Sequence, residues 1–163
     1  MTSPADELLL RLEAATERLR GLASRDPAPG ALTDADGRTG ERWDWGQVWA
    51  HLAEFPPYWM AQVRTLLARP GDEPVPFGRV ASDPDRIAAV ERDRSTPTKE
   101  LWVRLFTDLD ELRRLIGELR PEDWEREGLH QALGVMAMPR IFEEFLVGHL
   151  ESHARQLESL LPG

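Results

Sequence analysis

Apolar residues recur at alternating steps of three and four in four separate segments, and this spacing constrains the fold more than any other feature of the chain. An α-helix has 3.6 residues per turn, so residues with this spacing lie on one face of a helix. Almost no segment alternates apolar and polar residues as a half-buried strand would. The chain is therefore predicted to be all-α, and four amphipathic helices predict a four-helix bundle.

Start and stop signals predict helices at about residues 4–24, at about 45–68, from Thr96-Pro97 to Pro121, and from Pro139 to the end of its apolar stripe at Leu160. Ser3 can cap the first helix, and Asp44 with Gln47 three residues later has the spacing of a capping box. Pro56 and Pro57 are expected to kink or split the second helix, because proline lacks a backbone N–H and clashes with the preceding turn.

The connections between these helices are long and contain many proline and glycine residues. Residues 25–42 and 69–82 are predicted to be loops, and Asp83-Pro84 is predicted to open a short helix that ends near Arg94. Residues 121–138 are predicted to form a mixed connection with short helical turns at most. With connections this long, a simple up-down-up-down order of helices is not assured.

The composition excludes several classes of protein. The length of 163 residues predicts one domain over 1–163, and the net charge of -9 argues against a nucleic-acid partner. The absence of cysteine excludes a disulfide scaffold, thiolate-ligated zinc and a cysteine nucleophile. No apolar run is long enough to span a membrane, and the acidic amino terminus does not resemble a secretory signal, so a cytoplasmic protein is expected.

Three of the four histidines form the strongest candidate site. His149 and His153 are four residues apart on the apolar face of the last helix, a spacing that can bind one divalent metal ion. His51 lies at the edge of the buried stripe of the second helix. Facing helices of a bundle bring inward side chains together, so a three-histidine site with an open position for water or substrate is predicted. The alternative is that these are hydrogen-bonded core histidines.

Other residues near the predicted site have two interpretations each. Glu54 could hydrogen-bond a ligating imidazole or act as a base, or it could be an exposed glutamate at the rim of the bundle. Gln156 could support His153 or be an ordinary boundary residue, and His130 could line the pocket or pack in a loop. Three tryptophans at the start of the second helix are predicted to wall a pocket above the metal or to form part of a dimer face: Trp43, Trp45 and Trp49. Trp59 is predicted as pocket lining or core packing.

The sequence also resembles a known family. Residues 45–54 (WGQVWAHLAE) resemble the second-helix motif of the DinB/YfiT-like metalloenzymes, and residues 148–157 (GHLESHARQL) resemble their carboxyl-terminal His-x-x-x-His motif. The segment 124–134 resembles the stretch before their last helix. The resemblance implies a four-helix bundle of DinB/YfiT type, a homodimer, and a divalent metal, Zn or Ni first, on His51, His149 and His153.

Characterised members of that family include S-transferases that depend on mycothiol or bacillithiol, and a mycothiol-dependent maleylpyruvate isomerase. The resemblance therefore implies a metal-dependent transferase or isomerase that acts on a small molecule with a low-molecular-weight thiol. The absence of cysteine fits a thiolate supplied by the ligand. A hydrolase is a further possibility. The alternative is a non-enzymatic, stress-related dimeric bundle that binds a metal or an apolar ligand.

Overall fold

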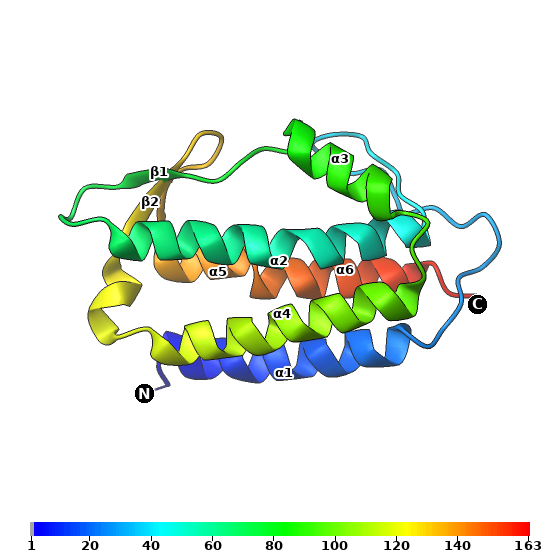
Figure 1. Ribbon diagram of the computed structural model, residues 1–163, viewed down its shortest axis with the longest axis horizontal. Helices are drawn as coiled ribbons and strands as arrows, with labels where there is room; N and C mark the ends of the chain where they lie inside the picture. The colour runs from blue at the N-terminus through cyan, green and yellow to red at the C-terminus, as the bar shows by residue number, and fades with distance from the viewer. Residues whose placement is uncertain (1) are drawn as a thin grey trace.

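Four helical columns lie side by side in the computed structural model, which describes residues 2–163 (Figure 1). They are α1 (Pro4–Leu22), α2 (Trp45–Ala68), α4 (Thr98–Glu118) and the pair α5 (Met138–Phe145) and α6 (Val147–Ser159). Both α1 and α2 pack against α4 and α6, so α1 and α2 lie diagonally across the bundle (Figure 1). The predicted four-helix bundle is confirmed, and the long connection between α1 and α2 is what allows this diagonal order.

The helices begin where the sequence predicts because the capping side chains satisfy free backbone donors. Ser3 accepts a hydrogen bond from the backbone of Asp6, and Asp44 accepts one from the backbone N of Gln47 at 2.9 Å. The backbone N of Asp44 in turn donates a hydrogen bond of 3.0 Å to Oε1 of Gln47, which completes a capping box. These caps fix where the buried stripes of α1 and α2 start.

Pro56 and Pro57 do not split α2, which continues unbroken from Trp45 to Ala68 (Figure 1). Apolar residues on both sides of the prolines, among them Leu52 and Val63, are fully buried in the core. A proline inside a helix costs about 3 kcal/mol. Burying several large side chains in each half of the helix exceeds that cost, since each contributes about 1.5–3 kcal/mol. Tertiary packing therefore overrides the local signal.

The last helix, predicted to be continuous from Pro139, is broken in two. Leu146 has φ −126° and ψ −92°, which ends α5, and α6 starts at Val147. Next to the break, Gly148 lies so close to the carbonyl of Glu143 that a Cβ atom would stand 2.0 Å from that oxygen. The close approach requires glycine at this position, immediately before His149.

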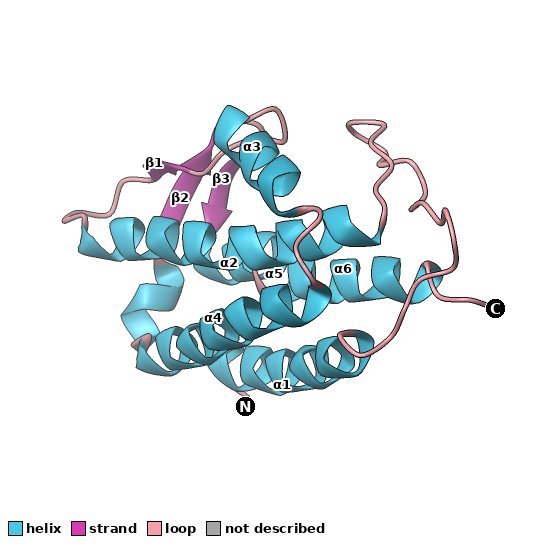
Figure 2. Ribbon diagram, turned by 45° about the vertical axis from the view of Figure 1, so that its right-hand side comes forward, coloured by secondary structure: helices cyan, strands magenta, loops and turns pink. Residues whose placement is uncertain are grey.

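Two of the predicted connections contain short strands that the sequence analysis did not foresee. β1 (Val75–Phe77) pairs in parallel with β2 (Glu127–His130), which pairs antiparallel with β3 (Gly134–Ala137) (Figure 2). A 3-10 helix, η1 (Pro121–Glu125), precedes β2. Strands of three or four residues carry too little alternation to be predicted. The short helix predicted after Asp83 is present as α3 (Pro84–Asp93), which packs against α2.

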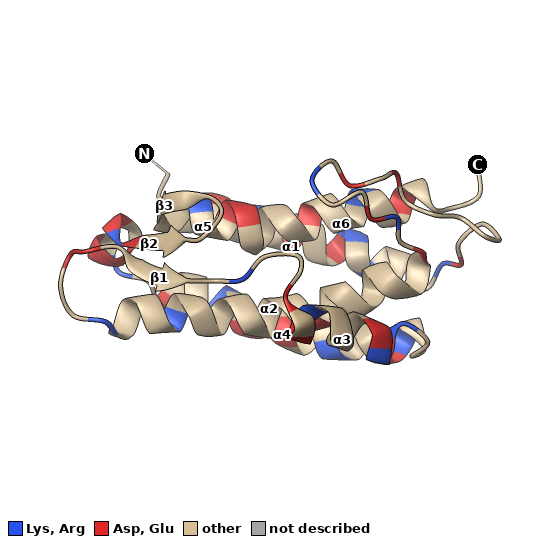
Figure 3. Cartoon of the chain, turned by 90° about the horizontal axis from the view of Figure 1, so that it is seen from above, with Lys and Arg blue, Asp and Glu red and all other residues tan. Residues whose placement is uncertain are grey.

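Acidic and basic residues are interleaved along the helices (Figure 3). Some of them form ion pairs between helices. Arg11 of α1 donates a hydrogen bond of 2.6 Å to Glu143 of α5 and also pairs with Glu151 of α6. The pKa of Glu143 is lowered by this guanidinium. Among the described residues, no helix is long and apolar enough to cross a membrane.

Candidate metal centre

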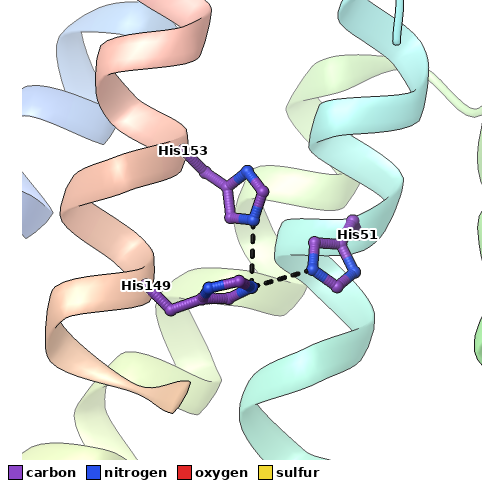
Figure 4. Close-up of side chains that lie close together, drawn as sticks. All are labelled: His51, His149 and His153. Carbon is purple, nitrogen blue, oxygen red and sulfur yellow. Dashed lines mark hydrogen bonds between the residues drawn. The ribbon is translucent and has the colours of Figure 1, made fainter. Parts of the chain in front are cut away.

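The side chains of His51, His149 and His153 meet between α2 and α6 (Figure 4). Nε2 of His149 lies 3.0 Å from Nε2 of His51 and 3.0 Å from Nε2 of His153. One ligand atom from each residue lies within 4.8 Å of the other two. The prediction that these three histidines share one site is confirmed.

The other ring nitrogens fix two of the imidazoles in place. Nδ1 of His153 donates a hydrogen bond to Oε1 of Gln156 at 2.6 Å. Nδ1 of His51 lies 2.9 Å from Oε2 of Glu54, although the angle falls outside hydrogen-bond geometry and this buried nitrogen has no other partner among the described residues. Neighbours of this kind hold a ligating histidine with its Nε2 toward a metal.

Burial favours the uncharged form of all three rings. Burial lowers the pKa of His153 to about 4, and burial together with the neighbouring histidines holds the pKa of His51 and of His149 well below the usual range. Neutral imidazole is the form that binds a metal ion.

The protonation pattern leaves the centre of the cluster short of donors. With Nδ1–H directed at Gln156 and at Glu54, His153 and His51 each present an Nε2 lone pair to the centre. Nε2 of His149 can donate to only one of them, so at least one buried lone pair has no donor. A cation at the centre would satisfy all three lone pairs, so the donor set fits a divalent ion.

Glu54 lies behind His51 and lines neither of the two cavities at the cluster. Nη2 of Arg79 donates to Oε2 of Glu54 at 2.7 Å, and both side chains are largely buried. The Arg79 guanidinium also lies 4.1 Å from the centre of the Tyr58 ring. Glu54 is therefore placed to orient His51. Because it lines neither cavity, it is not placed to act as a base there, and it is not exposed at the rim of the bundle.

The cluster opens into two connected spaces that share His51, His149 and Arg86. A small cavity of about 80 Å³ holds all three histidines with Gln156, and a larger pocket of about 320 Å³ extends from His51 and His149 toward the sheet. The larger pocket is of the size that accepts a small molecule. Two acidic side chains, Asp36 and Glu41, line both spaces.

One wall of the larger pocket is aromatic. The rings of Trp59 and Phe145 stack at 3.9 Å, and Phe145 stacks on His130 at 5.1 Å. Gly78 lies against this wall with φ +87°, and a Cβ atom there would approach His130 to 2.8 Å. The sequence alternatives for Trp59 and His130 are thus both realised, because each is buried and each lines the pocket.

Trp49 is a correction to the sequence analysis. It is fully buried, packs near Trp45 and Trp102, and lines neither space at the cluster. Its position on α2 turns it toward the core, two residues before His51.

Trp43 lines the small cavity, as one of its two interpretations predicts, whereas Asp36 and Arg86 were missed by the sequence analysis. Trp43 lies over the cluster, with its ring stacked on that of His153 at 6.2 Å, and Arg86 of α3 lies 5.1 Å from the Trp43 ring. Asp36 sits in a tight turn, where bonds from the backbone N of Thr39 and of Arg38 lower the pKa of its carboxyl. Asp36 lies in a loop, and Arg86 lies on a short helix whose periodicity does not relate it to the histidines, so nothing in the sequence pattern signals either residue.

No protein-family model matches the chain, and no curated protein matches its sequence. Among solved structures, YfiT from Bacillus subtilis aligns with a TM-score of 0.71 at 17% identity, over 96% of this chain and 85% of YfiT. The chain has a YfiT-like fold. YfiT is described as a probable metal-dependent hydrolase with an unusual four-helix bundle topology. An uncharacterised protein from Clostridium difficile 630 aligns with a TM-score of 0.62 at 11% identity, over 98% of this chain and 96% of that one.

Proposed function

We propose that the chain is an enzyme that binds one divalent metal ion, Zn²⁺ or Ni²⁺, on His51, His149 and His153 and acts on a small molecule in the adjoining pocket. The convergence of three neutral Nε2 atoms at the mouth of a pocket carries this proposal. Three protein ligands leave a coordination position open, which is the pattern of catalytic sites. The metal-dependent description of YfiT, whose fold the chain shares, supports it.

The residues around the cluster have separable roles in this proposal. Glu54 and Gln156 hold His51 and His153 in the ligating orientation. A bound divalent ion would supply Lewis acidity and lower the pKa of a water or thiol beside it. Asp36 and Glu41 are the carboxylates that line the same space. Glu41 is the one placed to accept a proton there, because Oδ1 of Asp36 already accepts bonds from its own turn.

Two nucleophiles are compatible with this arrangement. Water would make the protein a hydrolase, which the two carboxylates at the cavity and the description of YfiT support. A low-molecular-weight thiol such as mycothiol or bacillithiol would make it a transferase or isomerase, as the sequence resemblance implies. The chain has no cysteine, so in a thiol-dependent reaction the sulfur would have to come from the ligand. The homodimer, the single domain over 1–163 and the cytoplasmic location remain predictions.

The metal assignment is tested by elemental analysis of untagged protein after incubation with Zn²⁺ or Ni²⁺ and removal of excess metal. We expect about one equivalent in the wild type and none in His149→Ala. His130→Ala is the matched control, because His130 is also buried and lines the same pocket but makes its hydrogen bonds elsewhere. Full metal content in His149→Ala, with circular dichroism showing a folded helical protein, would contradict the ligand set.

The nucleophile is tested on the metal-loaded protein with two probes. Metal-dependent release of nitrophenol from a nitrophenyl ester without thiol would favour the hydrolase. Metal-dependent displacement of chloride from a chlorodinitrobenzene by mycothiol or bacillithiol, with no reaction when thiol is omitted, would favour the transferase. Inactivity on both, in protein that holds its metal, would favour the non-enzymatic alternative.

A further inference from the structure

Arg86 stands out among the cations of the pocket because its charge is only weakly compensated. Its side chain is 13% exposed and lines both spaces at the histidine cluster. Nη1 donates to the carbonyl of Ala81 at 2.8 Å, and Nη2 lies 3.5 Å from Oε2 of Glu41. The Trp43 ring covers the guanidinium at 5.1 Å. The group is therefore fixed in position, and its nearest carboxylate is distant for a hydrogen bond.

Arg79, which lines the larger pocket as well, makes a useful contrast. Its guanidinium is close to both oxygens of Glu54, with Nη2 2.7 Å from Oε2, in a buried pair. Its charge is thus already paired within the described chain. Arg38, the third cation of the pocket, is largely exposed and lies near Glu144. Arg86 is the guanidinium whose remaining N–H groups are free to bind a ligand.

The charge of the whole site also requires an anion, and this step rests on the proposed function. The pocket is lined by three arginines, Arg38, Arg79 and Arg86. The carboxylates that line it or pair with them number four: Asp36, Glu41, Glu54 and Glu144. These carboxylates exceed the arginines by one, so a divalent ion on the three histidines would leave one positive charge for a bound anion to balance. Charge buried in a space of low dielectric is costly unless it is compensated.

We infer that the substrate is a small carboxylate with an apolar body, whose carboxylate pairs with Arg86 and whose body lies along Trp59 and Phe145. A guanidinium binds a carboxylate through two parallel N–H bonds. Nη1 of Arg86 is bound to Ala81 and Nη2 makes only the long contact with Glu41, while Nε has no hydrogen-bond partner among the described residues. A phosphate has more acceptor oxygens and more negative charge than one guanidinium satisfies, so a carboxylate matches Arg86 better. The stacked pair of Trp59 and Phe145 offers a flat apolar surface on the pocket wall.

The test is calorimetric titration of metal-loaded protein with three probes of one shape: benzoate, phenyl phosphate and benzyl alcohol. We expect benzoate to bind most tightly to the wild type and at least about tenfold more weakly to Arg86→Gln, since a bond to a charged group contributes about 1.5–3 kcal/mol. Arg86→Lys should be intermediate, because it keeps the charge but loses the paired N–H groups. Arg64→Gln is the matched control, because Arg64 is an exposed arginine of α2 paired with Glu111.

Metal content and thermal unfolding are measured on every sample, so that the two proposals fail separately. A wild type that holds metal but binds benzoate no better than benzyl alcohol overturns the inference, as does equal benzoate affinity in wild type and Arg86→Gln. Tighter binding of phenyl phosphate overturns the choice of carboxylate. A wild type without metal that still binds benzoate through Arg86 overturns the metal proposal and supports the carboxylate subsite. Absence of both overturns both.

Discussion

Two regions of the molecule contain buried histidines, and the ring nitrogens have different partners in each. Between α2 and α6, His51 and His153 direct Nε2 at a shared centre. On β2, His130 is equally buried, but Nε2 donates to the carbonyl of Arg79 at 3.0 Å and Nδ1 accepts from the backbone N of Ala132 at 3.2 Å. Burial alone therefore does not indicate a ligand. The distinguishing feature is whether the second nitrogen finds a partner in the protein or faces other lone pairs.

The largest difference between the regions should appear as metal-dependent stability. Excess Zn²⁺ or Ni²⁺ should raise the melting temperature of the wild type, since a ligand at a hundred times its Kd stabilises by about 2.7 kcal/mol. His153→Ala should lose this increase completely. His130→Ala should keep it, although its starting stability is lower. The measurement is differential scanning calorimetry with and without metal. An unchanged metal response in His153→Ala would remove the distinction between the regions.

Two glycines allow the backbone of each region to be disturbed separately. Gly148→Ala places a Cβ 2.0 Å from the carbonyl oxygen of Glu143, and we expect the unfolding free energy to fall by about 3 kcal/mol and metal affinity to fall with it. Gly78→Ala meets a positive φ and the His130 ring, and we expect a loss of about 2 kcal/mol with metal affinity retained. Urea unfolding and metal titration measure both quantities. Wild-type metal affinity in Gly148→Ala would show that the α5–α6 break does not position His149.

The partners of the ligating rings should have a smaller effect. Glu54→Gln and Gln156→Ala should each weaken metal binding about 10–100-fold, because they loosen the orientation of His51 and His153 without removing a ligand. Competition with a chelator of known affinity measures this. Glu111→Gln, an exposed carboxylate of α4 that pairs with Arg64, is the control and should bind metal as the wild type does. Equal affinity in all of these variants would mean that the contacts of Glu54 and Gln156 with the two rings only stabilise the fold.

The smallest predicted effect lies outside both regions and provides a baseline for pH studies. Burial and the charge of Glu111 raise the pKa of Asp108 from 3.8 to about 6. The folded state therefore binds a proton more tightly than the unfolded state, so this group's contribution to stability is present below about pH 4 and is lost as pH rises through about 6. Because Asp108 is partly exposed, Asp108→Asn should gain only about 1 kcal/mol over the wild type near neutral pH, and nothing below about pH 4. Urea unfolding across this pH range measures the difference. A constant difference at all pH values would rule out the titration of Asp108 as its cause.

The sequence predicted the ligand set more completely than the pocket around it. His149 and His153 share a helical face by spacing, and His51 belongs to a buried stripe, so periodicity was sufficient to bring them together. Arg86 and Asp36 lie in or beside connections, where no period relates them to the site. Trp49 was misplaced because position on a helix near the site does not say which neighbour the side chain meets.

By itself, the sequence determined the four amphipathic helices, their capped starts and the inward position of three histidines, because these depend on the 3.6-residue repeat and on local hydrogen bonds. Only the tertiary structure decided that α2 passes through two prolines unbroken, that the last helix breaks at Leu146, and that the connections join in a small sheet. Each of these outcomes depends on burial against residues distant in the chain. The free energy of such long-range packing is larger than the local preference of a residue for helix or turn. Residues that pack in this way are not related by any regular spacing in the sequence.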